Sequence, residues 1–219
     1  MTQEVQKRSA AEAALEFVQP GSVVGVGTGT TTAYFIDGLP ARGVAGAVAS
    51  SEETRRALLA LRVPVVTLDD IGGELGLYVD GADQVDPLLQ LLKGGGGAMV
   101  REKVLATVAD RFVCIVDESK LVPALAGDRV AVEVLPMARA YVRRELEALG
   151  GIAEERPQCV TDNGNVILDV SGIDLSDPET LELTLEALPG VVGCGVFARR
   201  RADLALVGGA QGVRTLRRM

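Results

Sequence analysis

Short apolar runs that alternate with helical stretches dominate the first 127 residues of the chain. Such runs are expected to form buried strands, because strands that are covered on both faces carry few polar residues. Five of these runs stand at residues 22–26, 46–50, 64–68, 75–79 and 112–116. Strands separated by helices are typical of βα units, so this part of the chain predicts a doubly wound, mostly parallel sheet of the α/β class.

From about residue 128 the pattern changes to an α+β arrangement. The strand "VAVEVL" is followed by Pro136, at the expected start of a helix, and then by the strand "GIAEER". Asn163-Gly164 is a strong hairpin signal between "CVTD" and "VILDV", and Asp177-Pro178 opens a helix before "VVGCGVFA". The resulting β-α-β-β-α-β order is typical of small ferredoxin-like domains.

The chain is therefore expected to contain a main domain and an insertion. Residues 1–127 and 203–219 are assigned to the main α/β domain, because the apolar run "DLALVGG" is expected to return to its sheet. Residues 128–202 are assigned to the small, inserted α+β domain. Within the main domain, Ser50 and Glu53 have the spacing of a capping box and predict the start of a helix.

The charge balance argues against several classes of partner. The chain has 22 Lys and Arg against 30 Asp and Glu, a net charge of −8, and its basic residues form no stripe. Such an acidic chain is a poor match for a phosphate backbone, so no nucleic-acid partner is expected. No apolar run is long enough to span a bilayer and no targeting peptide is recognisable, so we expect no membrane partner and a cytoplasmic location.

Two residue types restrict the chemistry. The chain has no histidine, so proton transfer near neutral pH falls to a carboxylate, lysine, cysteine or tyrosine. Cys114, Cys159 and Cys194 lie far apart, which speaks against a thiolate metal cluster or a disulfide framework and fits a reducing compartment.

The segment "GVGTGTTT" at 25–32 is the first candidate binding loop. Its glycines let the backbone approach a ligand, and amides at a helix start attract anions. It is neither a dinucleotide fingerprint nor a Walker loop, because Thr30 replaces the third glycine and no Gly-Lys-Ser/Thr follows. An ordinary capped turn is the alternative, but three glycines with four threonines favour a phosphate cradle.

Three aspartates follow the run at 75–79. Asp80, Asp83 and Asp86 are expected at the carboxyl edge of the sheet, where open α/β sheets bind ligands. One of the three is expected to serve only in an Asx turn. The other carboxylates suit the hydroxyl groups of a sugar, and a divalent metal between Asp80 and Asp83 is the weaker alternative.

Four consecutive glycines, Gly94 to Gly97, precede a helix expected at about 98–109. Their amides can form a nest for an oxyanion beside Lys93. In the helix, Val100, Val104 and Val108 recur at the spacing of a core stripe, and Glu102 is expected to face away from them. Periodicity alone does not distinguish a functional Glu102 from a solvated helix acid.

Lys120 in "VDESKLV" follows the apolar run at 112–116. It is expected either to reach the same carboxyl edge or to cap a turn. All four segments stand at strand ends, so together they predict one cleft with an anion cradle, carboxylates and an oxyanion nest. This combination predicts a phosphorylated, hydroxyl-rich substrate and proton transfer by a carboxylate.

At these residues the sequence resembles the A-type ribose-5-phosphate isomerases. "GVGTGTTT", "YVDGADQVD", "LKGGGGAMVREK", "DESK" and "TDNGNVILDV" are similar to signature segments of that family, in the same order. The resemblance covers nearly the whole chain. It implies a doubly wound main domain with an inserted α+β domain, no metal or organic cofactor, and a homodimer or a larger oligomer built from dimers.

The resemblance also implies roles for individual residues. Glu102 would be the proton acceptor, and Lys93, Asp80 and Asp83 would assist it. Residues expected to contact the substrate are Lys7, Thr28, Gly29, Thr30, Thr31, Asp80, Gly81, Ala82, Asp83, Lys93, Gly94, Gly95, Gly96 and Lys120. Gln84 departs from the family, which more often has glutamate there, and little effect is expected.

The resulting hypothesis is the interconversion of D-ribose 5-phosphate and D-ribulose 5-phosphate through a cis-enediolate, a step of the non-oxidative pentose phosphate pathway. An aspartate, hypothetically Asp80, would assist ring opening, and Glu102 would move the proton from C2 to C1. One alternative is a sugar-phosphate-sensing binding module on the same fold. Another is an enzyme for a different substrate, such as an amino-sugar phosphate or a CoA thioester.

Overall fold

A computed structural model describes residues 1–126 and 129–217, and the chain divides into two compact units. The first unit consists of Met1–Ala82, Arg101–Leu121 and Ala202–Met219, and the second of Asp83–Val100 and Val122–Arg201. The second unit thus contains a segment, 83–100, that the sequence placed in the main domain. The expected boundary at 127/128 lies outside the described residues.

Strand pairing explains why residues 83–100 belong to the second unit. β4 pairs with β5, which pairs in turn with β11, and the Lys93 amide donates to the Gly195 carbonyl at 2.9 Å. The amide of Val122 donates to the carbonyl of Val85 at 3.0 Å. The bounds of this three-stranded sheet are β4 Gln84–Val85, β5 Leu91–Leu92 and β11 Val196–Phe197.

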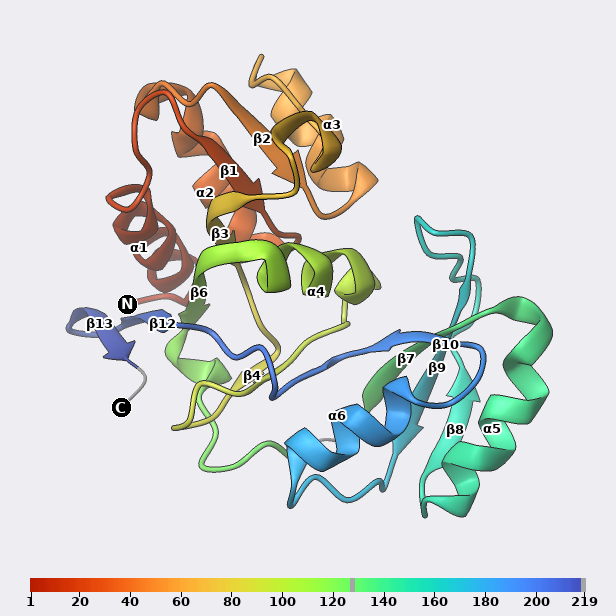
Figure 1. Ribbon diagram of the computed structural model, residues 1–219. Helices are drawn as coiled ribbons and strands as arrows, with labels where there is room; N and C mark the ends of the chain where they lie inside the picture. Colours follow the sequence, from red (N-terminus) through yellow and green to blue (C-terminus); the bar gives the residue numbers. More distant parts are fainter. Residues whose placement is uncertain (127–128, 218–219) are drawn as a thin grey trace. The chain divides into compact units, whose positions relative to one another are not determined.

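A six-stranded sheet forms the centre of the first unit (Figure 1). Its order is β13-β12-β6-β3-β1-β2, and all neighbours are parallel except the hairpin of β12 and β13. The strands are β1 Val23–Val26, β2 Gly46–Ala49, β3 Leu75–Asp80, β6 Ala109–Asp117, β12 Leu204–Gly209 and β13 Gly212–Arg217. The expected mostly parallel α/β sheet is confirmed.

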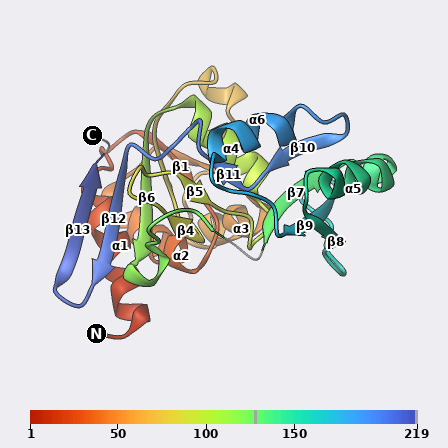
Figure 2. The same cartoon turned by 90° about the horizontal axis from the view of Figure 1, so that it is seen from below.

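Helices cover both faces of this sheet (Figures 1 and 2). The helices are α1 Gln3–Leu15, α2 Thr30–Gly38, α3 Glu52–Ala60 and α4 Met99–Val108. On one face, α1, α2 and α3 bury a core that includes Ala11, Phe35 and Leu58 against Val79 and Ile115 of the sheet. On the other face lies α4, whose residues from Arg101 onward belong to this unit. Short 3₁₀ turns stand at Leu39–Arg42, Asp69–Ile71 and Glu118–Lys120.

Two local predictions in this unit are wrong. Residues 64–68 form no strand, since only Val65 bridges to Ala47 at the outer edge of β2. The cap of α3 is Ser51, not Ser50, because the Ser51 hydroxyl accepts from the amide of Thr54 at 3.0 Å. Ser50 stays at the end of β2, where its side chain is buried.

The predicted core stripe of α4 is also wrong. Val104 is 47% exposed, whereas Glu102 is 4% exposed and shares the buried side of the helix with Met99, Leu105 and Ala106. The spacing of the three valines is that of a buried helix face, but the face that is buried carries Glu102 instead. Periodicity therefore predicted the wrong side of the helix. The helix is turned so that a carboxylate, rather than a valine, is buried.

A four-stranded antiparallel sheet of order β10-β7-β9-β8 forms most of the second unit. Its elements follow one another as β7-α5-β8-β9-α6-β10, the order expected from the sequence. Their bounds are β7 Val130–Val134, α5 Arg139–Ala148, β8 Ile152–Glu155, β9 Val166–Ser171, α6 Pro178–Glu186 and β10 Val191–Cys194. The core of the unit contains Val132, Leu146, Leu168 and Leu185.

Three details of the second unit differ from or refine the expectations. Pro136 begins a 3₁₀ turn, Pro136–Ala138, and α5 starts only at Arg139. The sequence "CVTD" forms no strand, because residues 156–165 are a loop that ends in a tight turn with Gly164 at φ +80°. Asp177 caps α6 by accepting from the amide of Thr180 at 3.2 Å, as expected.

No helix in 1–126 or 129–217 has the length and hydrophobicity needed to cross a membrane.

Candidate active site

Asp80 ends β3 in the first unit and is fully buried. One carboxylate oxygen accepts from the amides of Thr28 at 3.1 Å and Gly81 at 2.7 Å, and the other accepts from the Tyr78 hydroxyl. Gly27 packs directly against this carboxylate, so that any side chain at Gly27 would overlap it. The chain holds Asp80 in one orientation at the carboxyl edge of the sheet.

Glu102 lies on α4, near the same tyrosine. Burial raises the pKa of Tyr78 well above its usual value, and the charges of Asp80 and Glu102 raise it further. Tyr78 therefore remains a neutral hydrogen-bond donor throughout the neutral range. Burying an ionisable carboxylate is costly, so two buried carboxylates whose charges both act on one phenol make this a candidate functional site.

A cluster of hydroxyl groups surrounds Thr28. Its hydroxyl lies 2.8 Å from Ser50 Oγ, 2.8 Å from Ser51 Oγ and 3.1 Å from Thr54 Oγ1. Thr54 also donates to the carbonyl of Gly27 at 2.7 Å. These hydrogen bonds connect the segments that follow β1 and β2. The two segments meet because parallel neighbouring strands end at the same edge of the sheet.

The rest of the glycine-threonine loop opens α2. Gly29 is the N-cap at φ +130°, and no side chain of the described residues caps the first turn. Gly29 and Thr30 are exposed, and Thr31 is half-buried. The amides at this helix start are therefore accessible to an anion, and the phosphate cradle expected here stays a prediction.

Lys7 and Lys120 come from segments that one hydrogen bond connects. Gln6 of α1 donates to the side chain of Glu118 at 2.6 Å, and Glu118 begins the 3₁₀ turn that contains Lys120. The ammonium of Lys7 lies 3.3 Å from Glu4, and its side chain is 12% exposed. Two lysines are thus held on adjoining segments of the first unit.

Two aspartates of the second unit have different environments. Asp83 is exposed and accepts from the Gly95 amide at 3.0 Å. Asp86 is buried and accepts from the amides of Leu88 at 2.9 Å and Gln90 at 2.8 Å, and burial raises its pKa. Asp86 is therefore the aspartate that serves in a turn.

Lys93 and the glycine loop also belong to the second unit. Lys93 is 6% exposed, and its ammonium lies 5.7 Å from the centre of the Phe197 ring. In the loop, the Gly97 amide donates to the Gly94 carbonyl at 3.1 Å, and the Gly95 amide donates to Asp83. Two of the four glycine amides therefore already have partners, which leaves a smaller nest than the sequence predicted.

Comparison with known proteins identifies the family. A sequence model of the family "Ribose 5-phosphate isomerase A (phosphoriboisomerase A)" matches residues 46–212. The structure is similar to ribose 5 phosphate isomerase A from Neisseria gonorrhoeae, with 40% identity, a TM-score of 0.96 and coverage of 100% of this chain and 98% of that one. The chain belongs to the ribose 5-phosphate isomerase A family.

Two further structures agree with this membership. A D-ribose-5-phosphate isomerase in complex with phospho-erythronic acid is 37% identical, with a TM-score of 0.94 and full coverage of both chains. The enzyme from Methanocaldococcus jannaschii is 37% identical, with a TM-score of 0.93 and coverage of 99% of this chain and 100% of that one. The chain is therefore an isomerase, and the family resemblance of its sequence is confirmed.

Sequence reasoning missed several residues at this candidate site. Ser50, Ser51 and Thr54 contact Thr28, and none of the three was among the residues expected to contact the substrate. Tyr78 was treated only as part of an apolar strand, yet it donates to Asp80. The signal that could have found it is its spacing, because residues i and i+2 of a strand share a face.

Proposed function

We propose that the chain interconverts D-ribose 5-phosphate and D-ribulose 5-phosphate, with Glu102 as the general base. The observation that carries this proposal is the burial of Glu102 on the inner side of α4, where its charge acts on Tyr78. The ligand of one structural neighbour, phospho-erythronic acid, supports a sugar phosphate as substrate.

A coupled assay with ribose 5-phosphate tests this function directly. Formation of ribulose 5-phosphate is the expected result. Binding of the sugar phosphate without turnover would contradict the proposal and favour a sensor on the same fold.

The phosphate anchors the far end of the sugar. The amides of Gly29, Thr30 and Thr31 at the start of α2 provide donors, and Lys7 and Lys120 provide positive charge. Binding energy from this non-reacting end orients the carbons that react.

The aspartates and Glu102 move protons. During ring opening, a carboxylate of Asp80 or Asp83 takes the proton of the C1 hydroxyl and passes it to the ring oxygen as the bond between C1 and that oxygen breaks. Gly81 and Ala82 lie in the same segment. Glu102 then removes the proton from C2, the hydroxyl proton on O2 moves to O1, and Glu102 returns its own proton to C1. The intermediate between these steps is a cis-enediolate, whose oxygen charge needs donors. Lys93 and the amide of Gly96 supply them.

Replacing Lys93 with alanine should lower kcat more than it raises KM. The ammonium acts mainly on charge that develops in the transition state, and loss of one such donor costs about 10²–10³-fold. Steady-state kinetics with ribose 5-phosphate measures both constants. Equal changes in kcat and KM would instead mean that Lys93 only binds the substrate.

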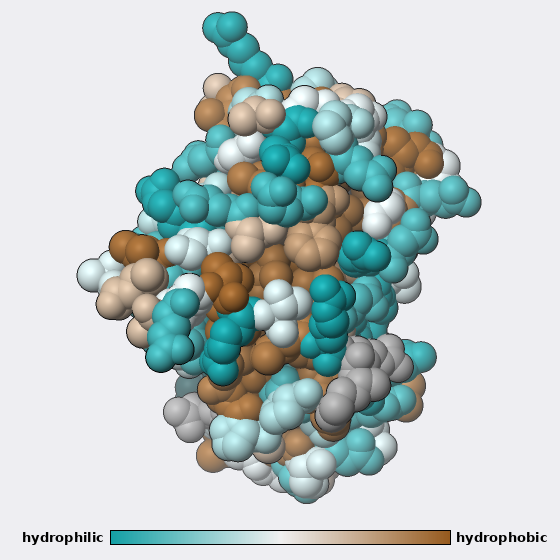
Figure 3. Space-filling model, turned by 90° about the vertical axis from the view of Figure 1, so that its left-hand side faces the viewer, coloured by the Kyte–Doolittle hydropathy of each residue, from teal (hydrophilic) through white to brown (hydrophobic). Residues whose placement is uncertain are grey.

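We also propose that the protein is a homodimer or an oligomer built from dimers. Several large apolar side chains of the first unit are exposed, among them Leu59, Leu61 and Val104. Figure 3 shows hydrophobic residues at the surface among hydrophilic ones on one face of the molecule. Light scattering on the purified protein should give at least twice the mass of the chain, and a monomer at assay concentrations would contradict this.

A further inference from the structure

A largely buried arginine of the second unit contacts the glycine loop. Arg156 follows β8, and its side chain is 14% exposed. Its Nε donates to Asp169 Oδ2 at 2.9 Å, and its Nη2 donates to Asp169 Oδ1 at 2.6 Å. Its Nη1 donates to the carbonyls of Gly94 at 2.9 Å and Gly95 at 3.3 Å. One planar guanidinium thus joins β9 to the glycine loop.

These carbonyl contacts fix the directions of two amide groups. In a trans peptide, the N–H points away from the C=O of the same peptide unit. The Gly94 carbonyl shares its unit with the Gly95 N–H, which donates to Asp83 at 3.0 Å. The Gly95 carbonyl shares its unit with the Gly96 N–H. Arg156 therefore orients both the amide that holds Asp83 and the amide of Gly96.

The positive charge of Arg156 also strengthens the two N–H donors that its hydrogen bonds orient. Its hydrogen bond to Asp169 raises the pKa of Arg156, and the charge of Asp83 adds a smaller effect, so the guanidinium is always charged. A cation at the carbonyl end of a peptide polarises it and makes its N–H a stronger donor.

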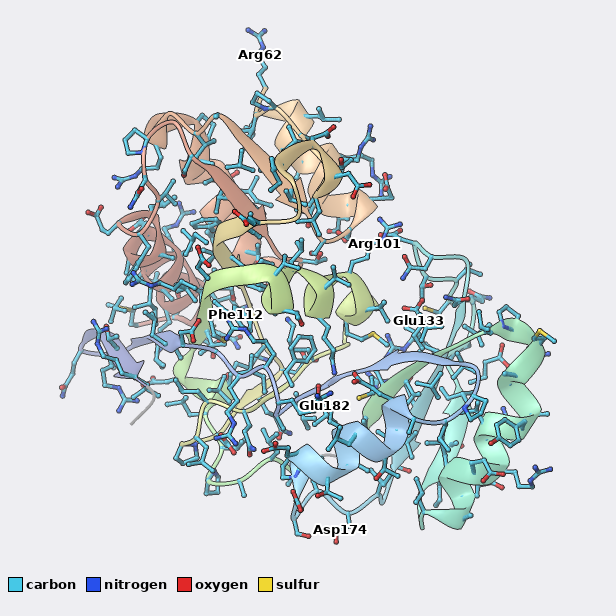
Figure 4. The ribbon with its side chains drawn as sticks, viewed as in Figure 1. Arg62, Arg101, Phe112, Glu133, Asp174 and Glu182 are labelled. Atoms are coloured by element: carbon cyan, nitrogen blue, oxygen red, sulfur yellow. The ribbon has the colours of Figure 1, made fainter. Side chains whose placement is uncertain are left out.

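The loop that carries Arg156 is itself anchored at its far end. Glu133 of β7, labelled in Figure 4, is fully buried. Its Oε1 accepts from Thr161 Oγ1 at 2.9 Å, Asn163 Nδ2 at 3.0 Å and Asn165 Nδ2 at 2.7 Å. These contacts hold the second half of the loop at 156–165 and so limit the movement of Arg156.

We propose that Arg156 is a positioning residue of the isomerase, which aims the glycine-loop amides at the enediolate oxygen and at Asp83. This inference rests on the proposed function, because it gives the loop its role in stabilising the intermediate. Arg156 does not touch the substrate in this account. It acts through the peptide units of Gly94 and Gly95.

Two substitutions test the proposal. Arg156→Lys keeps a charge but lacks the planar fork, and Arg156→Ala removes both. We expect each to lower kcat by about 10- to 100-fold while KM for ribose 5-phosphate changes less than about threefold, because misplaced donors weaken mainly transition-state contacts. Affinity for phospho-erythronic acid, whose carboxylate lies opposite its phosphate, should fall together with kcat. Added guanidinium should restore part of the activity of Arg156→Ala, and added ammonium should not.

Arg139 provides a matched control in the same unit. It pairs with Glu155 at 3.1 Å to each carboxylate oxygen and makes no hydrogen bond to the glycine loop. Arg139→Ala should keep the kinetic constants of the unaltered protein. Circular dichroism and thermal unfolding of all variants show whether each one is folded at the assay temperature.

The outcomes separate this inference from the proposed function. If the unaltered protein isomerises ribose 5-phosphate but Arg156→Lys retains its kcat, the positioning role is wrong and the function stands. Folded Arg156→Ala protein without guanidinium rescue, or with kcat and KM changed equally, would also overturn the role. If the unaltered protein has no isomerase activity, the proposed function itself fails.

Discussion

Replacing Glu102 with glutamine should remove almost all turnover of ribose 5-phosphate while the protein still binds the sugar phosphate. Glutamine has nearly the same shape but cannot accept the C2 proton, and a positioned base contributes about 10²–10⁴-fold to the rate. Because Glu102 is buried on α4, the amide should occupy the same space. Steady-state kinetics and calorimetric titration with phospho-erythronic acid measure the two effects separately.

The control for this substitution is Glu53→Gln. Glu53 is an exposed glutamate on α3, so the same chemical change there should leave both kcat and binding unaltered. Turnover of Glu102→Gln within a few-fold of the unaltered protein would mean that another group is the base. Loss of binding in proportion to turnover would mean that Glu102 mainly holds the substrate.

Replacing Gly27 with alanine should damage both the stability and the activity of the protein. A Cβ atom at Gly27 would overlap the Asp80 carboxylate, which is fixed by Tyr78 and by the amides of Thr28 and Gly81. Overpacking of this kind costs about 1–3 kcal/mol in the free energy of unfolding. Displacing a catalytic group by about 1 Å can cost about 10²-fold in rate. Chemical denaturation and kinetics measure the two losses.

Gly76→Ala is the matched control, because Gly76 lies in the neighbouring strand β3 and a Cβ there meets nothing within 4 Å. It should change the free energy of unfolding by no more than about 0.5 kcal/mol and leave activity intact. Equal effects of the two substitutions would show that the contact between Gly27 and Asp80 has no special importance.

The arrangement of the main sheet was predictable because its strands carry a simple physical signal. Runs such as "SVVGV" are apolar throughout, as a strand covered on both faces requires, and the polar loops follow at the ends of these strands. The run at 64–68 has the same composition but forms no strand, since Val65 alone bridges to the edge strand β2. Composition predicts that a segment can pair, while pairing itself depends on the neighbours available.

The orientation of α4 was not predictable from its pattern. The rule that the apolar face is buried assumes that burial stabilises the fold, and it placed Val104 inside and Glu102 outside. The structure has the reverse, with Val104 47% and Glu102 4% exposed. The proposed role of Glu102 accounts for this exception, because burial of a carboxylate is costly in stability but useful for chemistry.

Contacts between distant segments were also beyond the sequence. Arg156 is 62 residues from Gly94, and nothing in either local sequence indicates that they meet. Thr28 and Ser50 are 22 residues apart and meet because β1 and β2 are parallel neighbours. The loop motifs supplied the candidate residues, and the sheet order decided which of them lie together.

Hydrogen exchange at C2 of the sugar tests the role of Glu102 most directly. Ribose 5-phosphate is incubated in D2O with the unaltered protein or with Glu102→Gln, and NMR follows deuterium at C2 of the aldose and C1 of the ketose. The proton that Glu102 takes from C2 exchanges in part with solvent before it is returned, so we expect the unaltered protein to introduce deuterium and the variant, at saturating sugar phosphate, to introduce none. Deuterium entering at the same rate with Glu102→Gln would contradict the assignment of the base.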